Sequence, residues 1–377
     1  MKNILLIISM LFPVLLFAQK NKDTPKTLDL IIGTYTSGSS KGISVYRFYT
    51  ESGRVAYLSQ ITGVDNPSYL CVSDNNKFVY AVNEETKGGV SSFSFDPKSG
   101  KLGFINKQSS LGADPCYISV DKDQKNLFVA NYSSGNIAVF PLNKDGSIAP
   151  GIQTIHDDGH GPNKDRQEKA HVHTAVLSPD EKYVLYTDLG TDKLNITRYK
   201  SSQSNPIRPV DPPFVKVTPG NGPRHIAFSP DEKHLYLIQE MGSAITLFDY
   251  KKGHVTAKQT VSLLPEGFKG ETGAADIHIS PDGKFLYASN RGDANEIIVY
   301  AINQDTGELT YVDRTSSKGK GPRNFVIDPT GSFLLVANQN SNTVYVFRID
   351  KNSGKLTPTS NRIDIGNPVC LKFAPAE

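Results

Sequence analysis

The sequence predicts an all-β fold, a seven-bladed β-propeller with four antiparallel strands in each blade. Three observations lead to this prediction. A segment of roughly fifty residues recurs along the chain, a period typical of solenoids, propellers and arrays. Each copy contains short apolar runs separated by turn residues, and the two chain ends supply the separate parts of one further copy.

The clearest copy covers residues 274–310. Its runs at residues 277–279, 285–289 and 297–301 are rich in Ile, Val, Phe and Tyr, as is typical of β-strands between turns. The turn at residues 280–283 reads Ser-Pro-Asp-Gly, in which Pro presets φ and Gly accepts positive φ. A fourth run opens after the last turn, so the unit is a four-stranded antiparallel meander.

Five more copies of the opening phrase precede or follow this one: NPSYLCVS, DPCYISVD, HVHTAVLSPD, GPRHIAFSPD and GPRNFVIDPT. The seventh copy is divided. Residues 28–58 supply its second to fourth strands, and the C-terminal NPVCLKFAPAE supplies its first. A closed ring removes unpaired sheet edges, so residues 369–373 are predicted to pair with residues 28–33.

The N-terminal segment divides into three expected parts. Residues 1–18 contain Lys2, an apolar run and the small residue Ala18 at its end, which predicts a signal peptide. Residues 19–27 are expected to be a disordered leader and residues 28–377 the propeller. A buried N-terminal helix is the alternative for the first part. Export would place the protein in the periplasm or outside the cell, without stable membrane insertion once the leader is removed.

The composition narrows the classes of partner. The chain has 41 Lys and Arg against 38 Asp and Glu, and neither a basic stripe nor an aromatic platform suggests nucleic acid. Cys71, Cys116 and Cys370 are an odd number, which excludes complete internal pairing. We interpret them as small buried thiols, with a cysteine nucleophile as the alternative. The sequence does not identify a protein partner.

The largest insertion between repeats lies at residues 155–170 and is mostly polar. Long loops on a rigid scaffold often carry function, so this one is expected to cover a substrate. A metal site is the alternative, because several possible ligands lie near one another: His156, Asp157, Asp158, His160, His171 and His173. Their spacing matches no strong zinc pattern, and we predict neither a metal nor an organic cofactor.

Stacking the repeats brings two sets of residues to one face of the ring, because the first strand of a blade begins where the antiparallel second strand ends. The starts of the first strands contribute Ser68, Cys116, His173, Arg224, Ala275, Arg323 and Val369. The ends of the second strands contribute Asn83, Asn131, Asp188, Gln239, Asn290 and Asn338, followed by Glu84, Tyr132, Leu189, Glu240, Arg291 and Gln339. The recurring Asn has a structural explanation, since it accepts turn conformations.

Charged residues that interrupt these sets predict a functional site: His173, Arg224, Glu240, Arg291 and Arg323. Arginine presents a planar fork of donors to a carboxylate, a phosphate or a developing oxyanion. Histidine and glutamate can move protons near neutral pH. The set therefore suits an anionic substrate, and a ring of structural salt bridges is the alternative.

Several phrases resemble one family over essentially the whole mature chain: NPSYL, VANYSSGNIAVFPL, GPNKDRQEKAHVH, GPRHIAFSPD, LPEGF, AADIHISPDGKFLYASNRG and GPRNFVIDPTGSFLLVANQ. This is the lactonase family of seven-bladed propellers, which includes propeller-type 6-phosphogluconolactonase and the carboxymuconate lactonizing enzyme, or cyclase. The resemblance implies a carboxylic-ester hydrolase that opens a sugar lactone. Where related sequences often have His, this chain has Tyr117.

By motif, the resemblance implies the catalytic set His173, Arg224, Glu240 and Arg291, which agrees with the set that the stacked repeats indicate. We further expect the substrate to be bound by His171, His225, Asn290, Arg323 and Asn338. The expected function is lactone hydrolysis similar to that of 6-phosphogluconolactonase, on a small sugar lactone in an exported compartment. A propeller that binds a sugar acid or a protein without catalysis, and a lactonizing enzyme, are the alternatives.

Overall fold

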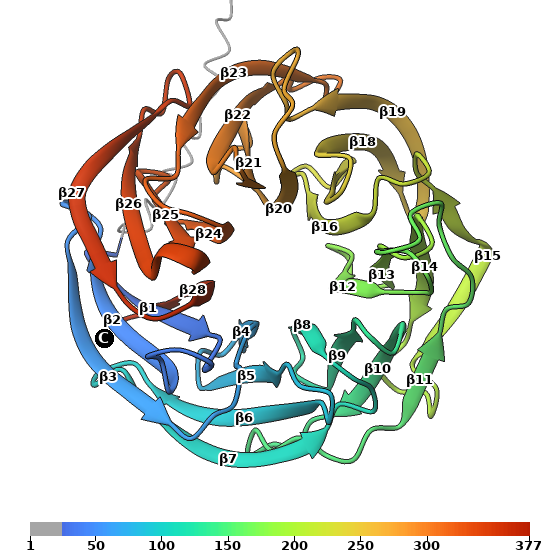
Figure 1. Cartoon of the computed structure of the whole chain (residues 1–377). Coiled ribbons are helices and arrows are strands. Elements are labelled where there is room, and N and C mark those ends of the chain that lie inside the picture. The colour runs from blue at the N-terminus through green and yellow to red at the C-terminus, as the bar shows by residue number, and fades with distance from the viewer. Residues whose placement is uncertain (1–24) are drawn as a thin grey trace, which may run out of the picture.

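A computed structural model describes residues 25–377, which form seven four-stranded antiparallel sheets arranged as the blades of a ring (Figure 1). The predicted seven-bladed propeller is confirmed. The predicted signal peptide and most of the leader lie outside the described residues. Within the described part, no helix is long and apolar enough to span a membrane.

Three blades follow the first one along the chain. Their strands are β4 (Leu70–Val72), β5 (Phe78–Asn83), β6 (Gly89–Asp96), β7 (Lys101–Ser109), β8 (Pro115–Val120), β9 (Asn126–Asn131), β10 (Asn136–Pro141), β11 (Gln153–His156), β12 (Val172–Leu177), β13 (Tyr183–Asp188), β14 (Lys193–Tyr199) and β15 (Ile207–Lys216).

Three more blades complete the consecutive set. Their strands are β16 (Pro223–Phe228), β17 (His234–Gln239), β18 (Ala244–Lys251), β19 (His254–Ser262), β20 (Thr272–Ile279), β21 (Phe285–Gly292), β22 (Glu296–Ile302), β23 (Leu309–Ser316), β24 (Pro322–Ile327), β25 (Phe333–Asn338), β26 (Thr343–Ile349) and β27 (Leu356–Asp364), with the short 3₁₀ helix η1 (Gln339–Ser341).

The remaining blade joins both ends of the chain: β1 (Thr27–Thr34), β2 (Gly42–Tyr49) and β3 (Val55–Thr62) are completed by β28 (Pro368–Pro375). Leu30 is opposite Phe373 and Ile32 is opposite Leu371, so the predicted closure by the two chain ends is confirmed. Figure 1 shows the dark red β28 on the axial side of the blue β1. No edge of this first blade is left open toward the axis.

The core lies between neighbouring blades. Side chains of β17 and β18 pack against those of β20, β21 and β22 in one fully buried cluster that includes Tyr236, Ile245, Leu286 and Ile298. The outermost strands contain both partly buried and exposed residues, as β7 does. Packing on both faces of the inner strands holds their ends in fixed positions.

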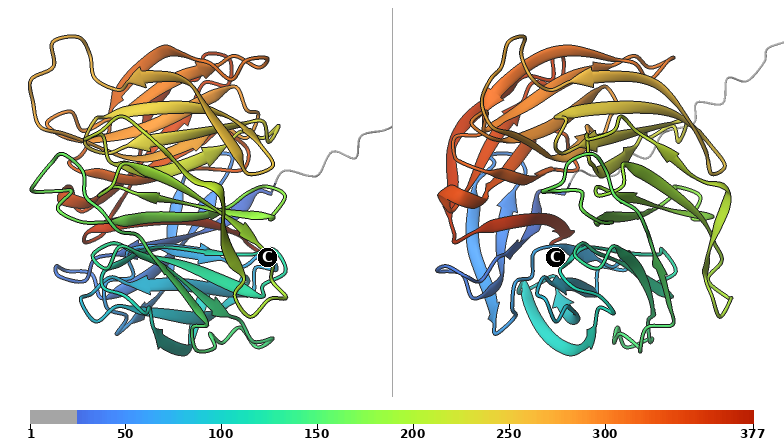
Figure 2. Two further views of the ribbon diagram at one scale, coloured as in Figure 1. Left: turned by 90° about the vertical axis from the view of Figure 1, so that its right-hand side faces the viewer. Right: turned by 45° about the vertical axis from the view of Figure 1, so that its right-hand side comes forward.

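The seven innermost strands are β4, β8, β12, β16, β20, β24 and β28, and they surround the ring axis in Figure 1. We call the face of the ring at which these strands begin the site face. In the left-hand view of Figure 2, the loops before β12 (green) and before β20 (gold) project from the same side of the ring. This is the face to which the stacked repeats assigned the charged residues.

A register shift near the start of the inner strands explains how those residues are aimed. In β12, β16 and β24 the pairing with the next strand skips His173, Arg224 and Arg323. The equivalent shifts in β8 and β28 skip Cys116 and Val369. A bulge leaves one residue out of the ladder, bends the strand and redirects a side chain. Five of the seven predicted first-strand residues are therefore bulge residues, whereas Ser68 precedes β4 and Ala275 lies in a two-residue shift of β20.

Candidate active site

Glu240 is the centre of an ion-pair cluster on the site face. It directly follows β17, and its Oε2 accepts a hydrogen bond of 2.9 Å from Arg224 Nε. Its Oε1 accepts 2.8 Å from Arg166 Nη2 and lies 3.3 Å from Arg291 Nη2. Three arginines from a loop, a bulge and a strand end therefore meet on one carboxylate.

The charges of this cluster do not balance. Burial alone would raise the pKa of Glu240, but Arg291, Arg224, His173 and Arg166 hold it well below its usual range. Burial is the main cause that lowers the pKa of Arg291 to about 10, with Glu240 opposing it and Arg224 adding to it. One ionised carboxylate facing three guanidinium groups leaves a formal excess of two positive charges. Such an excess favours an anion or a developing oxyanion.

His173 lies beside this cluster and is buried. Its Nδ1 is 3.8 Å from Cys116 Sγ, and its ring centre is 5.3 Å from that of His225. Burial and the nearby Arg224 and His225 lower the pKa of His173 well below its usual range. The imidazole is therefore neutral near pH 7 and is able to accept a proton.

His225 is held by a carboxylate that the sequence-based prediction did not include. Its Nδ1 is 2.8 Å from Asp276 Oδ1, and Asp276 Oδ2 lies 3.0 Å from His278 Nε2. Burial and Arg224 lower the pKa of His225 to about 4, although Asp276 opposes them. His225 and Asp276 both lie beside the Glu240 cluster, but their side chains interact with each other. A carboxylate within the first strand of the repeat is the signal that could have identified Asp276.

The long insertion reaches the site through Arg166, which was also absent from the prediction. Gln167 anchors the loop, because its buried side chain donates 2.8 Å to the Leu189 carbonyl. His171 stacks on Tyr132 with ring centres 4.4 Å apart, and its Nε2 lies 3.1 Å from Glu168 Oε1. Arg166 is the only arginine of the insertion, and this was the available signal. Among residues 25–377 no group of three His, Cys, Asp or Glu side chains is arranged to hold a metal.

The two asparagines that we expected to bind substrate make structural hydrogen bonds. Asn290 Oδ1 accepts 2.8 Å from Thr272 Oγ1 and 3.1 Å from the Gly273 amide. Asn338 Nδ2 donates 2.9 Å to the Ser317 carbonyl. Both side chains are fully buried, so their bonds support the explanation that the recurring Asn fixes turns. We leave both out of the site proposed below.

The cysteines of the described chain are free, and Cys116 and Cys370 are buried. Burial raises the pKa of the Cys71 thiol to about 12 and that of Cys370 to about 11. Burial likewise raises the pKa of Cys116, the cysteine that lies beside His173. Since the thiolate is the nucleophilic form, these shifts oppose the cysteine-nucleophile alternative.

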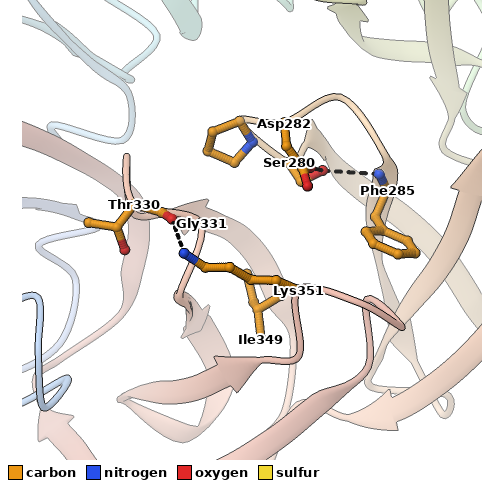
Figure 3. Close-up of a pocket in the computed structure, with 8 residues that line it drawn as sticks. Ser280, Asp282, Phe285, Thr330, Gly331, Ile349 and Lys351 are labelled. Carbon is orange, nitrogen blue, oxygen red and sulfur yellow. Dashed lines mark hydrogen bonds between the residues drawn. The ribbon is translucent and has the colours of Figure 1, made fainter. Parts of the chain in front are cut away.

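One cavity on the opposite face has a volume of about 280 Å³. It lies at the turn between β20 and β21, at the far end of β21 from Arg291 (Figure 3). Its polar groups serve the turns: Ser280 Oγ accepts from the Phe285 amide at 3.0 Å, and Lys351 Nζ donates to the Thr330 carbonyl at 2.7 Å. These groups are occupied, and none of them adjoins the Glu240 cluster.

Fold and site together define a seven-bladed propeller with a positively charged polar centre on one face. The family model described as "Lactonase, 7-bladed beta-propeller" matches residues 29–373. The chain belongs to this lactonase family of seven-bladed β-propellers, as its sequence phrases indicated.

Individual relatives support the same assignment. The chain is 36% identical over 345 residues to 6-phosphogluconolactonase of Bacillus subtilis, which covers 91% of this chain and 97% of the relative. The structure of a periplasmic gluconolactonase from Pseudomonas aeruginosa is 40% identical, with a TM-score of 0.88, and covers 92% of this chain and 99% of that one. A solved Bacteroides fragilis structure is 42% identical, with a TM-score of 0.89, over 93% and 98% of the two chains.

Proposed function

We propose that this protein hydrolyses a sugar lactone to its acid at the Glu240 cluster. The observation that carries the proposal is one ionised carboxylate held by three arginines beside a neutral histidine. Hydrolysis of an ester needs a base for the attacking water and donors for the oxyanion that forms. The relatives named as lactonases support the same reaction class.

In the proposed mechanism, His173 accepts a proton as water adds to the lactone carbonyl carbon. Arg224 and Arg291 donate to the carbonyl oxygen as it becomes negative. The bond between the carbonyl carbon and the ring oxygen then breaks, and the protonated His173 returns its proton to that oxygen. The product is the open hydroxy acid, and all atoms of the water are accounted for.

Glu240 is assigned a positioning role. The arginines keep its pKa well below the usual range, so it is ionised near neutral pH and carries no proton to donate. An ionised Glu240 does not protonate the leaving ring oxygen. Glu240 holds the guanidinium forks of Arg224 and Arg291 in place between turnovers.

A panel of lactones tests the proposal. Purified protein is expected to hydrolyse at least one sugar lactone, measured by acid release at constant pH above the spontaneous rate. The panel contains D-glucono-δ-lactone, its 6-phosphate and muconolactone. If no lactone is opened while gluconate binds in calorimetry, the proposed reaction is contradicted and the sugar-acid-binding alternative replaces it. Formation of a lactone from an open muconate would instead support the lactonizing alternative.

We further propose that the protein acts outside the cytoplasm, as the segment MKNILLIISMLFPVLLFA indicates. The relative from Pseudomonas aeruginosa named as periplasmic supports this location. Mass spectrometry of natively produced protein is expected to find an N-terminus near Gln19 in a periplasmic or secreted fraction. An intact Met1 in the cytoplasmic fraction would contradict export and favour an intracellular, phosphorylated substrate.

A further inference from the structure

A second carboxylate lies on the site face in the blade of β4 to β7. Glu84 follows β5 as Glu240 follows β17, so the two occupy equivalent positions in different blades. Tyr35 Oη donates 2.8 Å to Glu84 Oε1, and Ser68 Oγ donates to Glu84 Oε2. Tyr35 follows β1, so two neighbouring blades build this carboxylate site.

Arg323, the bulge residue of β24, lies beside the ring of Tyr35, whose hydroxyl donates to Glu84. Its guanidinium carbon is 5.5 Å from the centre of the Tyr35 ring. Burial would lower its pKa, but Tyr35, Glu84 and Glu240 outweigh burial and raise it. Within residues 25–377 its side chain makes no hydrogen bond or ion pair, unlike the three arginines tied to Glu240.

The two carboxylate sites differ in charge. Glu240 faces an excess of positive charge, whereas Glu84 and Arg323 balance formally. A carboxylate has about four acceptor positions, and the hydrogen bonds from Tyr35 and Ser68 use two of those on Glu84. The remaining acceptors and the five N–H donors of a guanidinium suit groups that both donate and accept, as hydroxyls do. A phosphate would be attracted by Arg323 but repelled by Glu84.

We propose that Glu84, Ser68, Tyr35 and Arg323 form a subsite for the hydroxyl-bearing carbons of an uncharged aldonolactone. The lactone carbonyl then lies at the Glu240 cluster, where the excess positive charge meets the developing oxyanion. This inference rests on the proposed function and adds the substrate class to it. The substrate is polyhydroxylated and carries no phosphate.

The test compares Glu84→Gln with the matched control Glu85→Gln, the adjacent glutamate, which lies outside the contacts described above. The substrates are D-glucono-δ-lactone and δ-valerolactone, which share a ring but differ in hydroxyl groups. Glu84→Gln is expected to raise KM for gluconolactone about tenfold, because a substrate hydroxyl then loses its hydrogen bond to a charged acceptor. Its kcat should change less than about twofold, within the scatter of a residue that does not act in the chemical step.

Kinetics on δ-valerolactone should be unchanged by Glu84→Gln, and Glu85→Gln should change neither substrate. Equal effects on both lactones, or no effect on either, would overturn the subsite while leaving lactone hydrolysis standing. The 6-phosphate of gluconolactone tests the substrate class, because a phosphate beside Glu84 would bind better once the negative charge is removed. A lower KM for that substrate in Glu84→Gln is therefore expected, whereas a higher kcat/KM for the 6-phosphate than for gluconolactone in the wild-type protein would contradict an uncharged substrate.

Calorimetry with gluconate gives a readout independent of turnover. Glu84→Gln is expected to weaken gluconate binding and Glu85→Gln to leave it unchanged. If the wild-type protein opens no lactone but this difference is observed, the proposed reaction fails and the subsite stands. If the wild-type protein opens lactones and the difference is absent, the subsite fails alone.

Discussion

Arg224→Ala and Arg291→Ala are each expected to lower kcat/KM for the hydrolysed lactone by roughly two orders of magnitude or more, as loss of an oxyanion donor does. Both guanidinium groups contact Glu240, and in the proposed mechanism both donate to the reacting carbonyl oxygen. Lysine at either position should restore only part of the activity, because a point charge does not reproduce the planar fork. Steady-state kinetics of the four variants measure both effects.

The two arginines should differ in their contribution to stability. Arg224 is almost fully buried, with only 1% of its surface exposed. Its Nη1 also donates to the Ala275 carbonyl at 2.5 Å. Arg224→Ala is therefore expected to lower the thermal midpoint, since loss of one partner of a buried pair destabilises the folded state. The side chain of Arg291 is 20% exposed, so its removal should cost less.

Deletion of residues 368–377 is expected to abolish cooperative folding. These residues include β28, whose Val369 and Leu371 side chains are buried. Full burial of a side chain of this size contributes about 1.5–3 kcal/mol, and a domain has only about 5–15 kcal/mol of net stability. The deletion also exposes the backbone of β1 as an open edge.

Deletion of Ala376 and Glu377 alone is the matched control, because both residues follow β28. Circular dichroism and thermal unfolding of the two truncated proteins compare the loss of the strand with the loss of the tail. An unchanged unfolding midpoint after deletion of residues 368–377 would contradict closure of the ring by the chain ends.

The fold was predictable because the same pattern of turns and short apolar runs occurs seven times along the chain. Turns such as Ser280 to Gly283 and the short apolar runs between them fix strand number and order, and the divided terminal copy fixes the closure. Where the pattern of one copy is ambiguous, the equivalent segments of the other copies still indicate the strand. The length of a strand is less determined, since β4 covers three residues and β15 covers ten.

The site was predictable only where a residue departs from the repeat. His173, Arg224 and Glu240 interrupt recurring positions, so their convergence followed from stacking the copies. Arg166 lies in an insertion that has no equivalent in other blades, and no alignment of repeats gives its position. Its contact with Glu240 depends on how Gln167 anchors the loop.

The hydrogen-bond partners inside the ring also could not be predicted from the sequence. Asp276 bonds side chains from the strands β16 and β24 as well as its own, among them His225 and Asn324. Such contacts depend on the register of the bulges, which the period-two pattern of a strand does not reveal. The recurring asparagines show the opposite case, since Asn290 and Asn338 reach the site face yet are buried in turn hydrogen bonds.

The central claim is that the Glu240 cluster performs the reaction, and a matched pair of arginine variants tests it most directly. Arg291 and Arg314 belong to the same blade, their side chains are 20% and 25% exposed, and each pairs with one glutamate. Hydrolysis of D-glucono-δ-lactone, or of the panel lactone that is opened best, is measured alongside thermal unfolding. Arg291→Ala should lose at least about a hundredfold in kcat/KM with a folded protein, and Arg314→Ala should retain full activity. Retained turnover in Arg291→Ala with a large fall in its thermal midpoint would mean that the cluster is a structural salt-bridge network.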